Sequence, residues 1–310
     1  MKRIQYRRYG GPETMKLESF ELEPPRQGQV AVKVRFVAIN PIDWKVRRGA
    51  LKMMTGNAFP RAMGSDFSGT VISVGAGVTR FKPGDAVFGL ARLKESGALG
   101  EAVVTNETFL AKKPDNLPFE DAACLGTPGV TAWNGLVDKA GLKRGQSVFI
   151  NGCTGAVGEA AVQIARMLGA TVSGSCSAEA MPRARDLGVQ NIFDYRTTDF
   201  SALRDRFDVV YDTAAVMPTA TGLHLAGRKG VFLDIDPTPM KFLRALFNRR
   251  LKPVVCSPRS DILNGIARAA GDGKLRLRIG EMVSLDQAIP LVTALEKSQK
   301  LAGKGLVAIA

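Results

Sequence analysis

The most constraining feature of this sequence is a glycine-rich turn that joins a short apolar run to a helical pattern. Residues 148–151 form the apolar run, and the turn contains Gly152, Gly155 and Gly158. Apolar residues then recur at helical spacing: Val157, Ala160, Ala161, Ile164, Ala165 and Leu168. Such glycines permit a tight turn and let backbone N–H groups approach a pyrophosphate at the positive end of a helix. The pattern predicts a dinucleotide-binding turn.

Strand-like segments continue to alternate with helix-length segments after this turn. The further strands are expected at residues 171–175, 191–194, 207–212, 230–235 and 252–256. The intervening segments are long enough for crossover helices, which indicates a parallel, doubly wound α/β sheet. We place this domain at residues 120–280.

Both ends of the chain are rich in strand patterns. Hydrophobicity alternates with a period of two along residues 29–40 and again along residues 274–279, which predicts strands. Residues 69–75 and a Pro-Gly-Asp turn at 83–85 indicate further strands. Ser284 begins a capping-box pattern that opens a helix, and an apolar strand is expected at 305–309. We therefore predict that residues 1–119 and 281–310 form one β-rich domain.

Composition excludes several kinds of chemistry. The four cysteines contain no Cys-x-x-Cys pair, and His224 is the only histidine, which excludes a multi-histidine metal centre or a histidine-dependent triad. No apolar run approaches the roughly 18 residues that span a bilayer, and the start lacks an export signal. We expect a cytoplasmic protein.

The charge of +14 favours anionic partners, although no specific nucleic acid is predicted. Its densest basic segment, residues 241–252, is interleaved with apolar residues. We expect an ordinary helix with a core face and a solvated basic face. The alternative is an interfacial helix that lies on an anionic membrane surface.

The second α/β strand ends without the carboxylate that usually binds the ribose 2′-hydroxyl of NAD. Ser175 and Ser177 stand there, and the residues that can join them around a 2′-phosphate are Tyr195, Arg183, Arg185 and Arg196. NADP(H) is therefore favoured over NAD(H), although Glu179 lies close enough in sequence to repel a phosphate.

Several motifs, in the same order, resemble the zinc-free quinone oxidoreductase-like branch of the medium-chain dehydrogenase/reductase superfamily. The matching segments are residues 40–45, 64–69, 81–87, 131–133, the glycine turn, 194–196 and 303–305. Within this branch the chain is most similar to the chloroplast-envelope and mitochondrial reticulon-interacting types. The resemblance implies a GroES-like catalytic domain, a Rossmann domain, an active site in the cleft and a homodimer.

The resemblance also implies roles for individual residues. Cofactor contacts are implied for Thr154, Gly155, Ala156, Val157, Ser177 and Tyr195, and cofactor-adjacent positions for Thr131, Asp234, Ile235 and Lys304. Asn40 would lie beside the nicotinamide and the substrate. Zinc-dependent relatives carry their ligands where this chain has Asn40, Ser65 and Thr127, which is not a zinc-binding set, so no zinc is expected. Leu51 and Glu179 depart from residues found in some relatives, a tyrosine and an arginine respectively.

These observations favour a reaction in which the substrate itself accepts the arriving electrons. A conjugated ketone or aldehyde takes hydride from NADPH at its β carbon, and the negative charge moves to oxygen as an enolate. A quinone accommodates the added electrons in a similar way. Asn40 would hydrogen-bond the acceptor oxygen. The alternative is a noncatalytic NADPH-binding protein that docks on anionic membrane or RNA surfaces.

Overall fold

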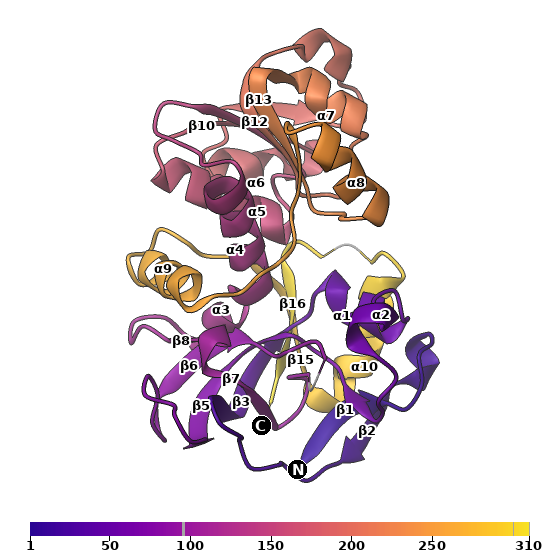
Figure 1. Cartoon of the computed structure of the whole chain (residues 1–310), viewed down its shortest axis with the longest axis vertical. Helices are drawn as coiled ribbons and strands as arrows, with labels where there is room; N and C mark the ends of the chain where they lie inside the picture. Colours follow the sequence, from indigo (N-terminus) through magenta and orange to yellow (C-terminus); the bar gives the residue numbers. More distant parts are fainter. Residues whose placement is uncertain (95–96, 300, 310) are drawn as a thin grey trace. The chain divides into compact units, whose positions relative to one another are not determined.

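The protein, seen in a computed structural model that describes residues 1–94, 97–299 and 301–309, divides into two compact units. Unit 1 comprises Met1–Thr127 and Pro258–Ala310, and unit 2 comprises Pro128–Ser257. The GroES-like β-rich and Rossmann classes expected from the sequence are confirmed (Figure 1). Among the described residues, no helix has the length and apolar character needed to cross a membrane.

Unit 1 is built mainly on antiparallel strands from both ends of the chain, although β15 and β16 pair in parallel. Its strands are β1 (Lys2–Tyr6), β2 (Lys16–Ser19), β3 (Gln29–Ala38), β4 (Arg61–Ala62), β5 (Asp66–Val74), β6 (Ala86–Leu90), β7 (Ala102–Asn106), β8 (Leu110–Lys112), β15 (Ile279–Ser284) and β16 (Lys304–Ala308). The main sheet has the order β15-β16-β3-β5-β6-β8, and β7 also pairs with β3. The C-terminal strand β16 therefore lies in the same sheet as the N-terminal strands and pairs with β3.

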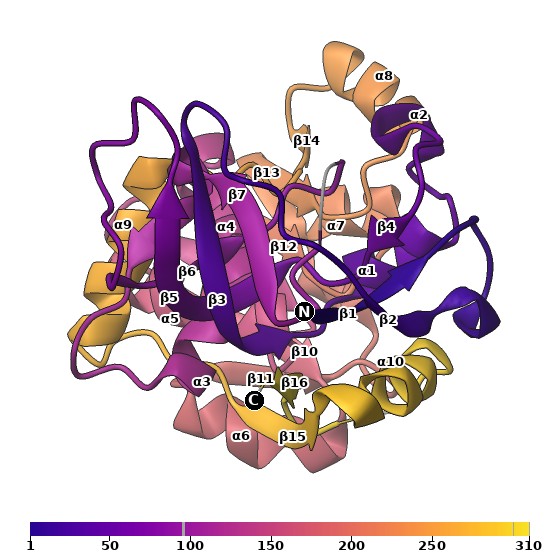
Figure 2. The same cartoon turned by 90° about the horizontal axis from the view of Figure 1, so that it is seen from below.

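The helices of unit 1 lie around this sheet. They are α1 (Pro41–Arg47), α2 (Lys52–Thr55), α3 (Phe119–Ala123), α9 (Ser260–Gly271) and α10 (Ala288–Glu296), and α4 (Gly126–Trp133) carries the chain onward. Figure 2 shows α10 beside β15 and β16. Helices α3 and α9 pack on strands of unit 1, although the sequence places both segments in the α/β domain.

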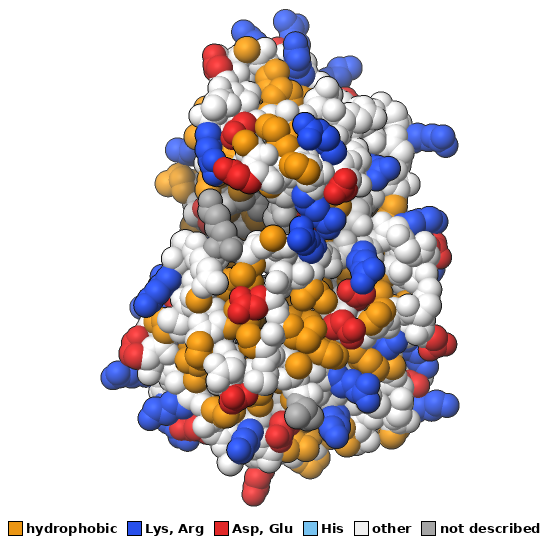
Figure 3. Space-filling model, turned by 180° about the vertical axis from the view of Figure 1, so that it is seen from behind, with side chains coloured by type: hydrophobic (Ala, Val, Ile, Leu, Met, Phe, Trp, Pro, Cys, Tyr) orange, Lys and Arg blue, Asp and Glu red, His pale blue; other side chains and the backbone are white. Residues whose placement is uncertain are grey.

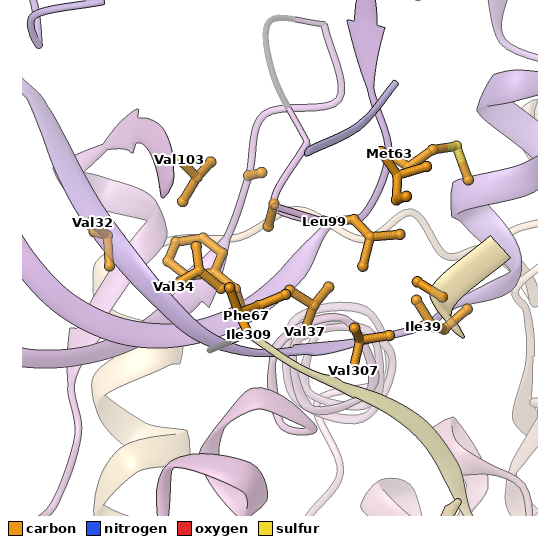
Figure 4. Close-up of a cluster of buried hydrophobic side chains, with 14 of the residues drawn as sticks. Val32, Val34, Val37, Ile39, Met63, Phe67, Leu99, Val103, Val307 and Ile309 are labelled. Atoms are coloured by element: carbon orange, nitrogen blue, oxygen red, sulfur yellow. The ribbon is translucent and has the colours of Figure 1, made fainter. Parts of the chain in front are cut away.

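The core of unit 1 gathers apolar side chains from strands distant in sequence. Figure 4 shows Val32 and Val34 of β3, Phe67 of β5, Val103 of β7 and Val307 of β16 as members of one cluster of buried side chains. Alternation in β3 directs these side chains to the same face. Complete burial of a side chain such as Phe67 stabilises the fold by about 1.5–3 kcal/mol, so this core fixes the register of β3 and β16.

Unit 2 is described throughout and contains a parallel six-stranded sheet of order β11-β10-β9-β12-β13-β14. The strands are β9 (Ser147–Asn151), β10 (Thr171–Cys176), β11 (Asn191–Asp194), β12 (Phe207–Asp212), β13 (Ala226–Asp234) and β14 (Leu251–Pro253). The helices are α5 (Ala156–Met167), α6 (Met181–Asp186), α7 (Thr219–Leu225) and α8 (Pro239–Phe247). The chain order reverses between β9 and β12, which creates a switch point at the carboxyl ends of these strands.

Four local expectations are wrong. Strand β14 ends at Pro253, because the chain leaves the sheet edge after pairing with β13. Residues 274–278 are not strand, and β15 begins at Ile279. The Ser284 hydroxyl bonds to Asp286 rather than to a helix N–H, so no capping box forms. Helix α8 has no apolar core face of the expected kind, since none of its residues is fully buried and only the small, partly buried Ala245 packs against the core of unit 2.

Candidate functional site

The glycine turn after β9 has the geometry of an anion-binding turn. Gly152 has a φ of +78°, which disfavours any residue with a side chain. A Cβ on Gly158 would lie 2.0 Å from the carbonyl oxygen of Gly152, so the helix approaches the turn more closely than any side chain allows. Gly155 caps α5 without a side-chain hydrogen bond. The first-turn N–H groups of α5 have no acceptor within the helix, and the turn therefore fits a pyrophosphate.

The predicted residues Thr154, Ala156 and Val157 occupy this turn and are half-buried. Their backbone lies at the positive end of a 12-residue helix. The structure therefore brings together the four residues of the turn for which cofactor contacts are expected.

The carboxyl ends of β10, β9 and β12 are tied by a buried network. The Ser175 hydroxyl donates to Asn151 Oδ1 over 2.5 Å, and Asn151 Nδ2 donates to Asp212 Oδ1 over 2.8 Å. Burial raises the pKa of Asp212 despite these hydrogen bonds. Ser175 is completely buried, so its hydroxyl holds the strand ends together and is not presented at the surface.

The residues predicted to select the cofactor meet just beyond β10. Glu179 accepts a 3.0 Å hydrogen bond from the guanidinium of Arg196, which also lies over the ring of Tyr195. A hydrogen bond from Ser177, followed by the bonds from its own backbone N–H and from Arg196, lowers the pKa of Glu179 to about 2. Glu179 therefore engages two of the groups that are candidates for a 2′-phosphate. The guanidinium of Arg183 instead pairs with Glu159 over 2.8 Å.

Asp234 and Ile235 lie at the end of β13 on the same edge of the sheet. The carboxylate of Asp234 is completely buried: its Oδ2 forms an ion pair with the Nζ of Lys241 at 2.8 Å, and its Oδ1 accepts from the backbone N–H of Asp236 at 2.8 Å. Asp234 thus anchors the start of α8. Thr131 belongs to α4, and its carbonyl oxygen accepts a 2.8 Å hydrogen bond from the buried hydroxyl of Tyr211.

A second group of predicted residues meets in unit 1. The Nζ of Lys304 donates to Asn40 Oδ1 over 2.6 Å and to the carbonyl oxygen of Ile39 over 2.7 Å. The Nδ2 of Asn40 donates to Asp66 Oδ2 over 2.9 Å and to the carbonyl oxygen of Ala38 over 3.2 Å. Both amide protons and the amide oxygen of Asn40 are therefore bound within the protein, which fixes the orientation of the side chain.

Two buried carboxylates complete this cluster. Asp66 accepts from the backbone N–H of Thr127 over 2.8 Å and from its hydroxyl over 2.6 Å. Asp43 accepts from the N–H of Asn40 and from the hydroxyl of Ser65, each over 2.8 Å, and so positions the start of α1. Burial raises the pKa of Asp66 and raises that of Asp43 to about 7. Ser65 is thus bound to Asp43, Thr127 to Asp66, and Asn40 to both carboxylates.

Sequence reasoning missed the role of Asp66. It lies within the matched segment 64–69, but only the pairing of β3 with β5 places it beside Asn40. In the described ranges, no cluster of three His, Cys, Asp or Glu side chains could hold a metal ion. The candidate residues fall into two groups, one at the carboxyl edge of the sheet in unit 2 and one around Asn40 in unit 1.

These two units and the glycine turn define the class of two-domain dehydrogenases. Residues 26–115 match the alcohol dehydrogenase GroES-like domain, and residues 187–307 match the zinc-binding dehydrogenase domain. The chloroplast envelope quinone oxidoreductase homolog of Arabidopsis thaliana is 28% identical over 93% of this chain and 92% of that protein. The chloroplastic NADPH-dependent alkenal/one oxidoreductase of the same plant is 35% identical over 78% of this chain and 64% of that protein.

The solved quinone oxidoreductase of Coxiella burnetii has the same architecture. It is 27% identical, with a TM-score of 0.90 over 100% of this chain and 99% of that chain. The chain therefore belongs to the medium-chain dehydrogenase/reductase superfamily, in its quinone oxidoreductase-like branch, and is an oxidoreductase.

Proposed function

We propose that the protein is a zinc-independent, NADPH-dependent reductase of conjugated ketones, conjugated aldehydes or quinones. The observation that carries this proposal is the hydrogen bonding of Asn40, Ser65 and Thr127 to the carboxylates of Asp43 and Asp66. Zinc-dependent relatives carry metal ligands at those three positions, whereas here the side chains are an amide and two hydroxyls, none a usual zinc ligand. The names of the relatives support the acceptor class and the cofactor.

The glycine turn supports cofactor binding by unit 2. We propose that Thr154, Gly155, Ala156 and Val157 hold the pyrophosphate through the N-terminus of α5. NADPH, when bound, supplies a hydride. We propose that Ser177 and Tyr195 contact the adenosine ribose of the cofactor. The residues proposed to lie beside the cofactor are Thr131, Asp234 and Ile235.

The acceptor class follows from how the electron pair is accommodated. When a hydride forms a C–H bond at the β carbon of an enone, the C=C π bond breaks and its electron pair moves to the carbonyl oxygen. The resulting enolate needs hydrogen-bond donors at oxygen and a proton at the α carbon, which water can supply. An isolated carbonyl would instead become an alkoxide, which needs a stronger acid.

We propose that Lys304, rather than Asn40, donates a hydrogen bond to the acceptor oxygen. The described contacts of Asn40 occupy both protons of its amide, whereas those of Lys304 account for two of the three protons on its ammonium. We therefore propose that Asn40 orients the ammonium of Lys304, and that Lys304 stabilises the negative charge on the acceptor oxygen.

The contacts of Glu179 bear on the choice of cofactor. A 2′-phosphate would need the donors that Glu179 now engages, Ser177 and Arg196. We propose that the phosphate replaces this carboxylate at Arg196, because a charge of nearly −2 and three oxygens form stronger hydrogen bonds. The preference for NADPH over NADH is then reduced, but not reversed, by Glu179.

The test is anaerobic oxidation of NADPH and NADH, in parallel, against enones, quinones and the saturated ketones that correspond to the enones. Cofactor deuterated at C4 and mass analysis of the product locate the transferred hydride. Enone turnover with deuterium at the β carbon is the expected result, and quinone turnover without enone turnover would narrow the acceptor to quinones. Cofactor binding without turnover across the panel would overturn the proposal.

A further inference from the structure

Helix α8 presents its apolar side to solvent. The exposed residues Met240, Phe242, Leu243, Leu246 and Phe247 occupy a continuous arc of the helix, which we call the α8 face. Leu246 is 76% exposed and Phe247 86% exposed. Single exposed apolar residues are ordinary, but a contiguous set on one helix face is typical of an interaction surface.

Polar contacts hold α8 in place from its opposite side. The Nζ of Lys241 pairs with the buried Asp234 at 2.8 Å and with Asp236 at 3.2 Å. Thr238 caps the helix by accepting from the N–H of Lys241, and Ala245 packs against the apolar core of unit 2. These contacts orient the helix so that its large apolar side chains are exposed.

The segment that carries the α8 face is predominantly basic, although Asp236 before it pairs with Lys241 and Asp261 after it pairs with Arg259. Residues 237–260 contain six Lys or Arg residues and no Asp or Glu. Arg244 and Arg249 are exposed, whereas Arg250 is bound to the carbonyl oxygens of Gly230 and Ala226. Figure 3 shows Lys and Arg side chains interspersed with Asp and Glu side chains on the face that it draws.

We propose that the α8 face docks on an anionic lipid surface. Its apolar residues would enter the boundary between headgroups and acyl chains, and Arg244 and Arg249 would contact headgroup phosphates. A second copy of this chain fits less well, because a two-fold contact between α8 faces would bring the same arginines together. This docking goes beyond the proposed reduction and needs neither cofactor nor acceptor.

The test uses flotation of the full chain with vesicles of phosphatidylcholine alone or mixed with phosphatidylglycerol. We expect binding to the mixed vesicles at about 0.15 M salt and little binding to the neutral ones. The double variant Leu246→Ser/Phe247→Ser should weaken binding at least about tenfold, because it removes the two most exposed apolar side chains of the face. Arg244→Gln should weaken it by roughly fivefold.

A matched control is Val216→Ser, which alters a side chain that is 75% exposed elsewhere in unit 2. It should bind vesicles like the unmodified protein, and the double variant should keep its activity toward a water-soluble acceptor. The proposal is overturned if the unmodified chain does not bind anionic vesicles or if the double variant binds them equally well. It is also overturned if the double variant only converts a dimer to a monomer in light scattering.

Discussion

The ammonium of Lys304 donates a 2.6 Å hydrogen bond to the amide oxygen of Asn40, a residue 264 positions earlier in the chain. The contact exists because β16 pairs antiparallel with β3, which places the start of the last strand beside the residues that follow β3. Asp66 accepts from the other end of the same amide. An amide held at both ends is a rigid support for a charged donor.

Replacing Lys304 by methionine should remove the donor while keeping the apolar stem. We expect kcat/KM for an enone to fall by about 100-fold, the usual contribution of one positioned donor to an oxyanion, with little change in the KM for NADPH. Steady-state kinetics over a pH series provide the measurement. Thr127→Val is the matched control, since it removes a hydrogen bond to Asp66 but leaves the ammonium in place. An equal loss of kcat in the control would show that Lys304 is only structural.

Two glycine substitutions should separate folding from cofactor binding. Gly158→Ala places a methyl group 2.0 Å from the oxygen of Gly152, and because backbone must shift, we expect a loss of about 3 kcal/mol of unfolding free energy. Gly155→Ala meets that oxygen at 3.4 Å, an ordinary contact. It should therefore leave the unfolding free energy within about 1 kcal/mol of that of the unmodified protein. It should weaken NADPH binding about tenfold, because the added methyl group crowds the pyrophosphate.

Urea unfolding and calorimetric titration measure the two effects. Equal destabilisation by both substitutions would contradict the packing argument. Unchanged NADPH affinity in Gly155→Ala would place the pyrophosphate elsewhere.

Local patterns predicted much of unit 2, because strand and helix periods are properties of short segments. The strands at 191–194 and 207–212 have the predicted bounds, and α5 follows the glycine turn as expected. The exposed side of α8 was not predictable in this way. Its periodicity indicates an amphipathic helix, but tertiary contacts, chiefly the ion pair of Lys241 with Asp234 and the packing of Ala245, decide which side faces the protein.

The candidate site was predicted in part. Asn40 and Lys304 were identified separately through resemblance, but their contact depends on strand pairing between opposite ends of the chain. Likewise, Ser175 lies at the predicted strand end, yet its hydroxyl points to Asn151 because the neighbouring parallel strand supplies an acceptor. Sequence patterns identify residue types at an edge, whereas tertiary packing decides which polar groups are already bound.

Glu179→Gln should strengthen the preference for NADPH. The substitution removes the charge that pairs with Arg196, so we expect the Kd for NADPH to fall by about fivefold and that for NADH to change little. Fluorescence titration of both cofactors at low and high salt measures the change, and the difference should shrink as salt screens it. Arg196→Gln should act in the opposite direction. Equal effects on both cofactors would show that Glu179 does not lie near the 2′-phosphate.

Asp43 should make the protein less stable as the pH rises toward neutrality. Burial raises the pKa of this carboxyl from an ordinary value of 3.8 to about 7 in the folded state. Between these values the unfolded chain has released the proton and the folded chain still holds it, so the free energy of unfolding falls as pH increases. The slope for one such group approaches about 1.4 kcal/mol per pH unit.

Asp43→Asn should flatten this dependence, because the amide keeps the shape of the carboxyl and can still accept from the N–H of Asn40. Urea unfolding between about pH 5 and pH 8 measures the slope in both proteins. Asp286→Asn is the control, since a hydrogen bond from Ser284 lowers the pKa of that exposed carboxyl and its titration lies below this window. Parallel slopes for the unmodified protein and Asp43→Asn would mean that Asp43 is already ionised in the folded protein. Any remaining loss of stability with rising pH would then be assigned to Asp66, because burial also raises the pKa of that carboxyl.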